Sequence, residues 1–166
     1  MNQALLSSKK MDYCTPQDFF NRLDTEFHFT LDAAATSESA KCSVYDTSET
    51  DGLRSPWDIT RGAVFCNPPY GRKIGEWVRK AFQEAKKGVT IVLLIPARTD
   101  TSYFHEYIYG VAEIRFVRGR LHFTDENGNG YPPAPFPSMV VVYNGKKHEL
   151  YGQKSKGGRC HACFGN

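Results

Sequence analysis

The sequence has few apolar stretches, and this argues against a membrane protein. Residues 4–6 and 89–95 are its main apolar runs, and the longer one has the length of a buried strand rather than of a membrane span. The opening residues also lack the pattern of a secretory signal. We therefore expect a cytoplasmic protein without a membrane segment.

Cysteines are few and irregularly spaced. Their number, five, is odd, which fits reduced thiols better than a disulfide framework. Cys160, His161 and Cys163 form a cluster of metal-ligating side chains, but a zinc site needs about four ligands and no second pair lies nearby. The sequence therefore predicts neither disulfides nor a bound metal.

Length and composition predict one folded domain. A chain of 166 residues with 40% apolar and 13% aromatic residues can bury a core without crosslinks. Residues 1–12 show no hydrophobic periodicity, and the last residues are rich in Lys and Gly. We expect a flexible arm at 1–12, a single domain at 13–144 and a disordered basic tail at 145–166.

Charge is distributed unevenly along the chain. Residues 1–60 carry five basic and ten acidic side chains, whereas residues 61–166 carry sixteen basic and eight acidic ones. Clustered positive charge is typical of a surface that binds phosphates, because neutralised phosphates release counterions. A merely solvated surface can show the same excess, so both interpretations stay open.

The first part of the chain predicts a helix and a strand. Residues 15–18 (TPQD) have the pattern of a helix start, with a hydroxyl N-cap, proline at the first helical position and a carboxylate in the first turn. Residues 27–31 alternate like a strand. In the polar stretch that follows, only residues 44–45 suggest another short strand.

The middle of the chain predicts a βαβ unit. Residues 63–66 are a short apolar run, and the apolar residues of 74–85 recur along one helical face up to Gly88, a C-terminal stop. Residues 89–95 then form an apolar run rich in β-branched residues, the pattern of a parallel strand covered on both faces. The order strand, helix, strand indicates a parallel pair.

The last part predicts a short helix at 102–109 and three strands, at 114–117, 120–123 and 139–143. A turn-rich segment with four prolines separates the last two strands. The predicted fold is α/β, a Rossmann-like sheet that is mostly parallel, with an antiparallel C-terminal hairpin at one edge.

The quartet Asn67-Pro68-Pro69-Tyr70 follows the buried strand at 63–66. Open α/β sheets bind ligands in the crevice beyond the carboxyl ends of their strands, so the quartet has the position of a binding site. Each proline removes a backbone N–H and fixes φ, so the turn presents carbonyl acceptors in a rigid arrangement. The Asn67 amide oxygen adds another acceptor.

These acceptors suit methyl transfer to an amino nitrogen. The N6 amino group of adenine is a weak nucleophile because its lone pair is delocalised into the ring. The Asn67 amide oxygen and the Pro68 carbonyl, placed on its two N–H bonds, would stabilise the positive charge that develops as the nitrogen attacks a methyl group. Tyr70 offers a ring on which a flipped base can stack. The alternative is a proline-rich turn with Tyr70 packed locally.

Together with other segments, the quartet makes the chain resemble the phage-type DNA N6-adenine methyltransferases, a group within the class I S-adenosylmethionine-dependent methyltransferase fold. The resemblance covers residues 15–143. It rests on FCNPPYG at 65–71, LDAA at 31–34, AKC at 40–42, DGL at 51–53, Trp57, PARTDT at 96–101, and RGR at 118–120 with Phe123.

The resemblance implies S-adenosylmethionine as cofactor, double-stranded DNA as substrate, a phage or prophage gene expressed in a bacterial host, and no obligate protein partner. It implies that Thr15 and Pro16 lie near the methionine end of the cofactor and that Asp32 binds its ammonium group. Ala33 and Ala34, at the end of the first strand, would contact the cofactor there. Asp46 would bind the ribose, and Asp51 would accept from the adenine amino group. Ala33 and Ala34 replace the Gly-rich turn of the wider family. A capping role for Asp32 and a solvated acidic loop are the alternatives.

Basic and hydroxyl side chains beyond the quartet are expected to bind DNA. Arg98, Thr99 and Thr101 follow the second parallel strand and therefore face the same crevice. The alternative for the charges near the C-terminal strands is simple exposure on an edge strand. Phosphate contact is expected for these side chains beside the C-terminal strands: Arg115, Arg118, Arg120 and His122.

Two other functions remain open at this stage. The same quartet occurs in methyltransferases for RNA amino groups and for a protein glutamine amide, which share an NH2 on an sp2 carbon. The missing Gly-rich turn also allows a non-catalytic DNA-binding relative. The leading prediction is a site-specific DNA adenine N6-methyltransferase whose specificity comes from short loops such as 124–137.

Overall fold

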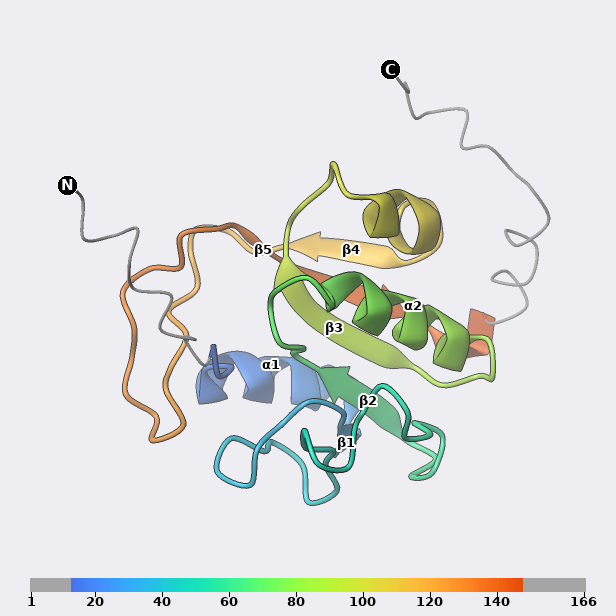
Figure 1. Cartoon of the computed structure of the whole chain (residues 1–166), viewed down its shortest axis with the longest axis horizontal. Helices are drawn as coiled ribbons and strands as arrows, with labels where there is room; N and C mark the ends of the chain where they lie inside the picture. The colour runs from blue at the N-terminus through green and yellow to red at the C-terminus, as the bar shows by residue number, and fades with distance from the viewer. Residues whose placement is uncertain (1–12, 148–166) are drawn as a thin grey trace.

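A five-stranded sheet forms the centre of the molecule in a computed structural model that describes residues 13–147 (Figure 1). The strand order is β1-β2-β3-β5-β4, and β1, β2 and β3 are parallel neighbours. β5 runs antiparallel to both β3 and β4, so β4 points in the same direction as β3. The strands are β1 (Phe29–Asp32), β2 (Ala63–Cys66), β3 (Ile91–Pro96), β4 (Glu113–Phe116) and β5 (Ser138–Tyr143).

The sheet confirms the mixed α/β class, the βαβ unit and an antiparallel pair of C-terminal strands at one edge, but its strand pairing is parallel only from β1 to β3. β5 lies between β3 and β4, and β4 is the edge strand. Residues 120–123 form no strand, although Phe123 is fully buried. The carbonyls of Leu121 and Phe123 accept hydrogen bonds from Ala134 and Tyr131 of the same loop, which satisfies their backbone without a neighbouring strand.

Helix α1 (Gln17–Phe27) begins one residue later than the sequence pattern suggests. Pro16 occupies the N-cap position and no side chain caps the helix, so the prediction of a Thr15 hydroxyl cap is wrong. The helix ends at His28, whose φ of 54° is left-handed and whose N–H donates to the Asp24 carbonyl at 2.8 Å. Because the left-handed conformation of His28 stops the helix, β1 begins at the next residue, Phe29.

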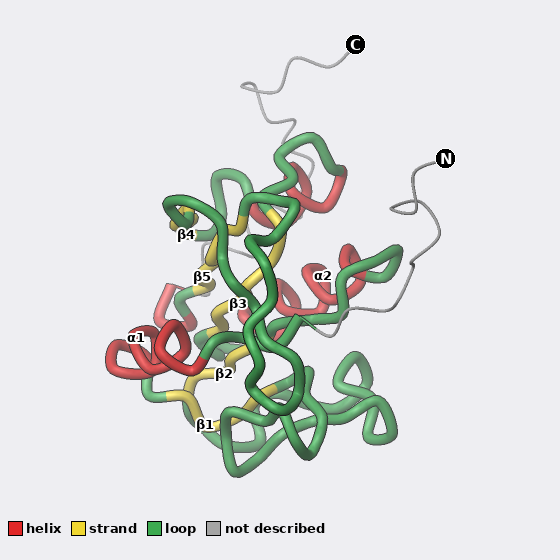
Figure 2. The backbone as a smooth tube through the Cα atoms, turned by 90° about the vertical axis from the view of Figure 1, so that its left-hand side faces the viewer, coloured by secondary structure: helices red, strands yellow, loops and turns green. Residues whose placement is uncertain are grey.

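Helices cover both faces of the sheet, as the edge-on view shows (Figure 2). On one face α2 (Ile74–Ala85) and the π-helical turn η2 (Phe104–Ile108) bury residues that include Trp77 and Phe82, which confirms the predicted helix core. On the other face α1 and residues 117–136 pack over alternate residues of β2, β3 and β5. The sheet is therefore buried on both sides, as its apolar strands require.

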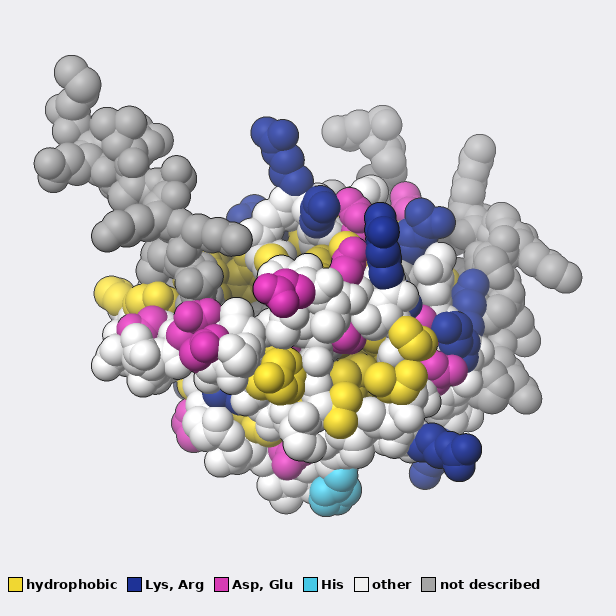
Figure 3. All heavy atoms as spheres, turned by 60° about the horizontal axis from the view of Figure 1, so that its bottom comes forward, with side chains coloured by type: hydrophobic (Ala, Val, Ile, Leu, Met, Phe, Trp, Pro, Cys, Tyr) yellow, Lys and Arg dark blue, Asp and Glu magenta, His cyan; other side chains and the backbone are white. Residues whose placement is uncertain are grey.

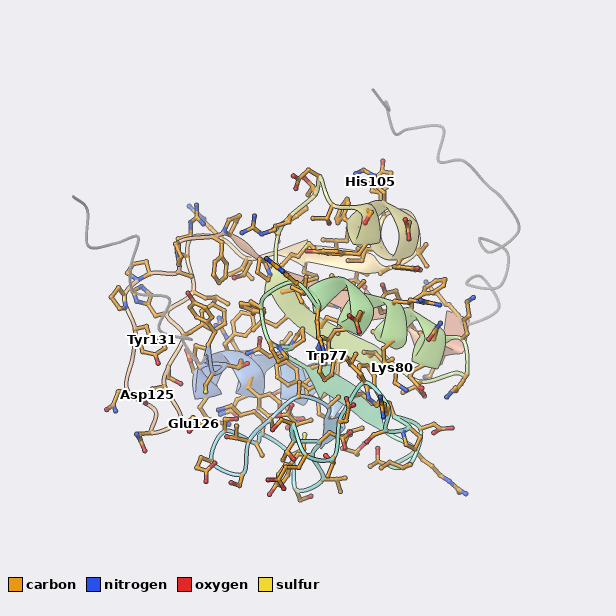
Figure 4. All side chains as sticks on the ribbon, viewed as in Figure 1. Trp77, Lys80, His105, Asp125, Glu126 and Tyr131 are labelled. Carbon is orange, nitrogen blue, oxygen red and sulfur yellow. The ribbon has the colours of Figure 1, made fainter. Side chains whose placement is uncertain are left out.

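The chain between β1 and β2 is attached to α2 through Trp57. This side chain is fully buried, stacks on Trp77 with ring centroids 6.3 Å apart, and donates from Nε1 to the Gly52 carbonyl at 2.8 Å. Lys80 lies over the Trp57 ring and ion-pairs with the buried Glu84. Figure 4 labels Trp77 and Lys80, which both belong to α2. Residues 33–58 thus have a fixed position although they contain little regular structure.

The predicted chain ends fall largely outside the described residues. This applies to the arm at 1–12 and to residues 148–166, with Cys160, His161 and Cys163 among them. Gly145–Lys147 form the short 3-10 helix η3. No helix within residues 13–147 is long and apolar enough to span a bilayer.

Gly52→Ala tests the attachment of this loop. A Cβ at Gly52 would overlap with the Ala33 carbonyl oxygen and lie 2.9 Å from the Trp77 ring. We expect the substitution to lower the free energy of unfolding by about 3 kcal/mol, measured by urea denaturation. Gly130→Ala is the matched control, because nothing lies within 4 Å of its Cβ, and it should change stability by no more than about 0.5 kcal/mol. Equal stability of the two variants would contradict this account.

Candidate active site

The quartet lies at the carboxyl end of β2, where the Asn67 side chain is held from one side. Its Nδ2 donates to the Tyr13 carbonyl at 2.7 Å and to the Thr15 hydroxyl at 3.0 Å. These two acceptors identify Nδ2 and therefore fix which way the amide faces. The opposite atom, Oδ1, is buried and has no hydrogen-bond partner among the described residues.

The prolines leave a second acceptor beside Asn67. Pro68 is buried and Pro69 is exposed. No hydrogen bond to the Pro68 carbonyl forms within residues 13–147. Because a buried acceptor without a donor is costly, Asn67 Oδ1 suits a ligand that donates an N–H, and the Pro68 carbonyl offers a second acceptor in the same turn.

Tyr70 is fixed in place by β3 and by other aromatic rings. Its hydroxyl donates to the Leu94 carbonyl at 3.2 Å, and burial raises the pKa of Tyr70, which keeps the hydroxyl protonated. The ring stacks on Tyr13 with centroids 5.6 Å apart and meets Phe123 and Phe136 edge to face. A base that stacks on the face covered by Tyr13 must displace that ring.

The sequence indicated no role for Tyr13, Phe123 or Phe136 at the quartet. Tyr13 comes two residues before Thr15, at the end of a segment without periodicity, and Phe136 lies in a proline-rich stretch. Their aromatic character was the one available signal. It did not identify a partner, because the contacts join segments more than 50 residues apart, as the Asn67 bond to Tyr13 does.

Asp32 ends β1 in a buried position. Its carboxylate accepts from the backbone N–H of Lys41 at 3.0 Å and of Ala34 at 3.4 Å, as the capping alternative predicts. Burial raises the pKa of Asp32 to about 6, although these hydrogen bonds and the charge of Lys41 favour the ionised form. The backbone of Ala33, buried itself, bonds to Phe65 of β2.

Asp46 lies beside Asp32, because its N–H donates to the Asp32 carbonyl at 2.9 Å and Tyr45 forms an isolated parallel bridge with Asp32. Oδ1 of Asp46 accepts from the Thr50 hydroxyl at 3.1 Å. Oδ2 is buried and has no partner among the described residues. Asp46 is thus a second buried side chain with a free acceptor at this edge of the sheet.

Asp51 is more open than the other predicted cofactor residues. Its side chain is 44% exposed and lies 3.4 Å from the guanidinium of Arg54. The residue has a φ of 55°, and Oδ1 accepts from the N–H of Leu53 at 3.2 Å. These contacts give Asp51 a role in shaping the loop, and its predicted cofactor contact stays a prediction.

Cys66 is the nearest candidate nucleophile, directly before the quartet. It is fully buried in β2, and burial raises the pKa of its thiol well above the usual value. A protonated, enclosed thiol is a poor nucleophile. The geometry therefore offers hydrogen-bond acceptors at this site and no reactive thiolate.

Comparison with known proteins identifies the family. A model of the DNA N-6-adenine-methyltransferase (Dam) family matches residues 3–156. The chain belongs to the Dam family. The DNA N-6-adenine-methyltransferase of Escherichia phage T1 is 32% identical over 135 residues, which are 81% of this Dam-family chain and 56% of the phage T1 protein. The chain thus spans little more than half the length of that relative, and the resemblance noted from the sequence is confirmed.

The predicted DNA-binding residues of this Dam-family chain fall into two places. Arg98 and Thr101 line a groove next to Tyr70, while Thr99 is exposed nearby. Arg118 and Arg120 are exposed in the loop after β4. Since β4 is parallel to β3, that loop leaves the sheet at the same edge as the quartet, so all five side chains remain candidates for DNA contact.

Two other basic side chains of the Dam-family chain have protein partners. The Arg115 guanidinium forms a bidentate pair with Glu26 at 2.6 and 2.7 Å and also bonds Glu113, so it has protein acceptors, and its predicted phosphate contact stays a prediction. His122 lies 3.2 Å from the Tyr131 carbonyl. The ion pairs of Arg115 link edge strand β4 to α1.

The face around β1 and the loop that follows it differs from the groove in charge. Figure 3 shows acidic side chains scattered over this face, with the visible Lys and Arg side chains mainly toward its upper and right-hand edges. This agrees with the acidic first part of the sequence. A cationic ligand is therefore favoured on this side and an anionic one on the other.

The raised pKa of Asp32 predicts that the free energy of unfolding of this Dam-family chain depends on pH. Its folded pKa of about 6 lies above the unfolded value of about 3.9, so its contribution is fully present below pH ~4 and is lost as the pH rises through 6. The free energy of unfolding should fall by ~3 kcal/mol over this pH range. Urea denaturation of wild type and Asp32→Asn between pH 4 and 7 measures it as a pH-dependent difference. A difference between wild type and Asp32→Asn that stays constant over this pH range would refute the assignment.

Proposed function

We propose that this Dam-family protein transfers a methyl group from S-adenosylmethionine to N6 of an adenine flipped out of double-stranded DNA. The observation that carries the proposal is the Asn67 side chain, whose Nδ2 is anchored and whose Oδ1 is buried and free. An anchored acceptor is preorganised, so it stabilises developing positive charge without reorganisation. An amino group on an aromatic ring supplies the donors that this site lacks.

The quartet would act on the nucleophile. Asn67 Oδ1 and the Pro68 carbonyl accept the two N–H bonds of the amino group and draw its lone pair out of the ring. Both bonds strengthen as the nitrogen becomes positive, so they stabilise the transition state more than the ground state. Pro69 keeps the turn rigid, and Tyr70 supports the base by stacking. The proton leaves to water after methyl transfer.

The residues before the quartet fit a sulfonium cofactor. Asp46 Oδ2 is buried without a donor, which suits a ribose hydroxyl, and the buried carboxylate of Asp32 suits the ammonium. Bound S-adenosylmethionine supplies an electrophilic methyl group. Ala33 and Ala34 have small side chains that let the ligand approach the backbone. We assign Thr15, Pro16 and Asp51 to the same site on the strength of the family resemblance.

DNA would approach the edge of the sheet that carries the quartet. Arg98, Thr99 and Thr101 lie after β3, and Arg118 and Arg120 lie after β4, so the phosphate contacts would flank the flipped base on one side. Entry of the base requires Tyr13 to move from Tyr70. The net positive charge of residues 61–166 supports an anionic partner at this edge.

Asn67→Ala is the direct test of this mechanism. Without the acceptor, methyl transfer to DNA should fall at least about 100-fold, while calorimetry should show nearly unchanged S-adenosylmethionine binding. Asn21→Ala, an exposed asparagine on α1, is the control and should keep full activity. Full activity of Asn67→Ala would refute the mechanism.

A radiolabel assay should offer DNA, RNA and ribosomal protein side by side to the wild-type protein. We expect the label to appear in DNA. Label that appears only in RNA or in ribosomal protein would show that DNA is not the substrate. Absence of any S-adenosylmethionine binding at millimolar ligand would instead favour a non-catalytic DNA-binding protein.

Thr15 provides a second test, because its hydroxyl holds the Asn67 amide at 3.0 Å. Thr15→Val keeps the shape and removes the acceptor, so Asn67 can turn away from its productive orientation. We expect kcat to fall roughly fivefold with KM for DNA little changed, since the hydrogen bond is worth about 1 kcal/mol. Thr15→Ser restores the hydroxyl and should restore kcat. A change in KM for the cofactor with kcat unchanged would leave Thr15 with the cofactor contact alone and refute its role in orienting Asn67.

A further inference from the structure

A groove of about 820 Å3 begins at Tyr70 and extends between the start of α2 and the segment after β3. This volume is typical of sites for small molecules and nucleotides. Asn67 and Pro68 do not line it. A base held by those two acceptors therefore leaves the groove open, and the groove shares only Tyr70 with the quartet.

Three guanidinium groups from three different segments line the groove. Arg72 belongs to the loop after the quartet, Arg79 to α2 and Arg98 to the segment after β3. None of them forms an ion pair within residues 13–147. Glu76 and Glu106 also line the groove, so it offers acceptors as well as an excess of positive charge. Such a lining suits a ligand with an anionic part and a neutral polar part.

A buried hydroxyl in the groove lacks a partner. Tyr103 is 9% exposed, and its Oη has no hydrogen bond in the described part of the chain. The Tyr103 ring packs against Gly75, where an added Cβ would lie 3.4 Å away. The hydroxyl itself is buried beside the groove, so a ligand would reach it only after a small shift of the side chains that cover it, and the polar edge of that ligand would then supply the missing partner. Tyr107 and Phe136 add aromatic surface to the same lining.

We propose that this groove holds a second nucleotide of the DNA strand that carries the target adenine. Its base would lie against the aromatic side chains with a polar edge at the Tyr103 hydroxyl, and its phosphate would lie on the guanidinium groups. Aromatic rings bind bases of any sequence, and arginines bind the backbone. The inference rests on the proposed function for its ligand, DNA, and adds a second base contact next to the flipped one.

Binding of single strands without adenine tests the groove separately from methyl transfer. The probes are fluorescent oligothymidylate of about eight nucleotides and an abasic deoxyribose-phosphate strand of equal length and charge, with Kd measured by anisotropy. Thymine has no exocyclic amino group, so the quartet cannot methylate it. The wild-type protein should prefer oligothymidylate over the abasic strand by roughly tenfold.

Two conservative variants separate the base contact from the phosphate contact. Tyr103→Phe removes only the hydroxyl and should reduce the preference for oligothymidylate to about threefold or less. Arg79→Gln should weaken both strands equally and lower the salt slope by about 0.7. Arg61→Gln is the control, because Arg61 is exposed before β2, at the opposite edge of the sheet, and it should change neither value. Melting temperatures verify that each variant folds.

The outcomes separate this inference from the proposed function. An unchanged preference in Tyr103→Phe, together with an unchanged salt slope in Arg79→Gln, overturns the nucleotide groove even if the wild-type protein methylates adenine in DNA. A reduced preference in Tyr103→Phe supports the groove even if the radiolabel assay detects no methylation of DNA, and in that case the proposed function fails alone.

Discussion

The two hydrogen bonds from the Asn67 amide to residues 13 and 15 are the contacts on which the rest of the site depends. They join the segment before α1 to the end of β2 and leave the opposite oxygen of the amide free. The same segment carries Tyr13, whose ring stacks on Tyr70, and Cys14, whose backbone pairs with Thr124. One short stretch therefore determines the orientation of the acceptor, the position of the aromatic ring and the path of the long loop.

The sheet brings these parts together because four of its five strands point the same way. β1, β2, β3 and β4 all end at one edge, and reversed β5 fills the place between β3 and β4. Asp32 ends the first of these strands, and Asn67, Arg98 and Arg118 follow the other three, although all four residues lie far apart in the sequence. Acidic groups and basic groups consequently flank the quartet on opposite sides. This separation suits a cationic cofactor on one side and an anionic polymer on the other.

Sequence patterns predicted the local elements of this fold well. The βαβ unit was predictable because the apolar runs of β2 and β3 and the helical periodicity of α2 are local properties. The strand prediction for residues 120–123 failed because an alternating apolar pattern indicates burial, and Phe123 is buried without belonging to a strand. The quartet was identifiable from its composition, whereas the anchoring of Asn67 by Tyr13 depends on a tertiary contact. The ion pair of Arg115 was likewise not predictable from the sequence, since its partner Glu26 is 89 residues away.

The loop between β4 and β5 has a property that matters for divergence. Phe116 at the end of β4 pairs with Met139 near the start of β5, so the loop leaves and re-enters the sheet at neighbouring positions. A change in its length leaves the strand register intact, and doubling the length of such a loop costs only about 0.6 kcal/mol of closure entropy. Related chains can therefore extend the exposed turn at 126–130 without displacing Phe123 and Ala134, which are buried in the core. Such an extension would change the surface beside the quartet while the Asn67 and Pro68 acceptors kept their positions.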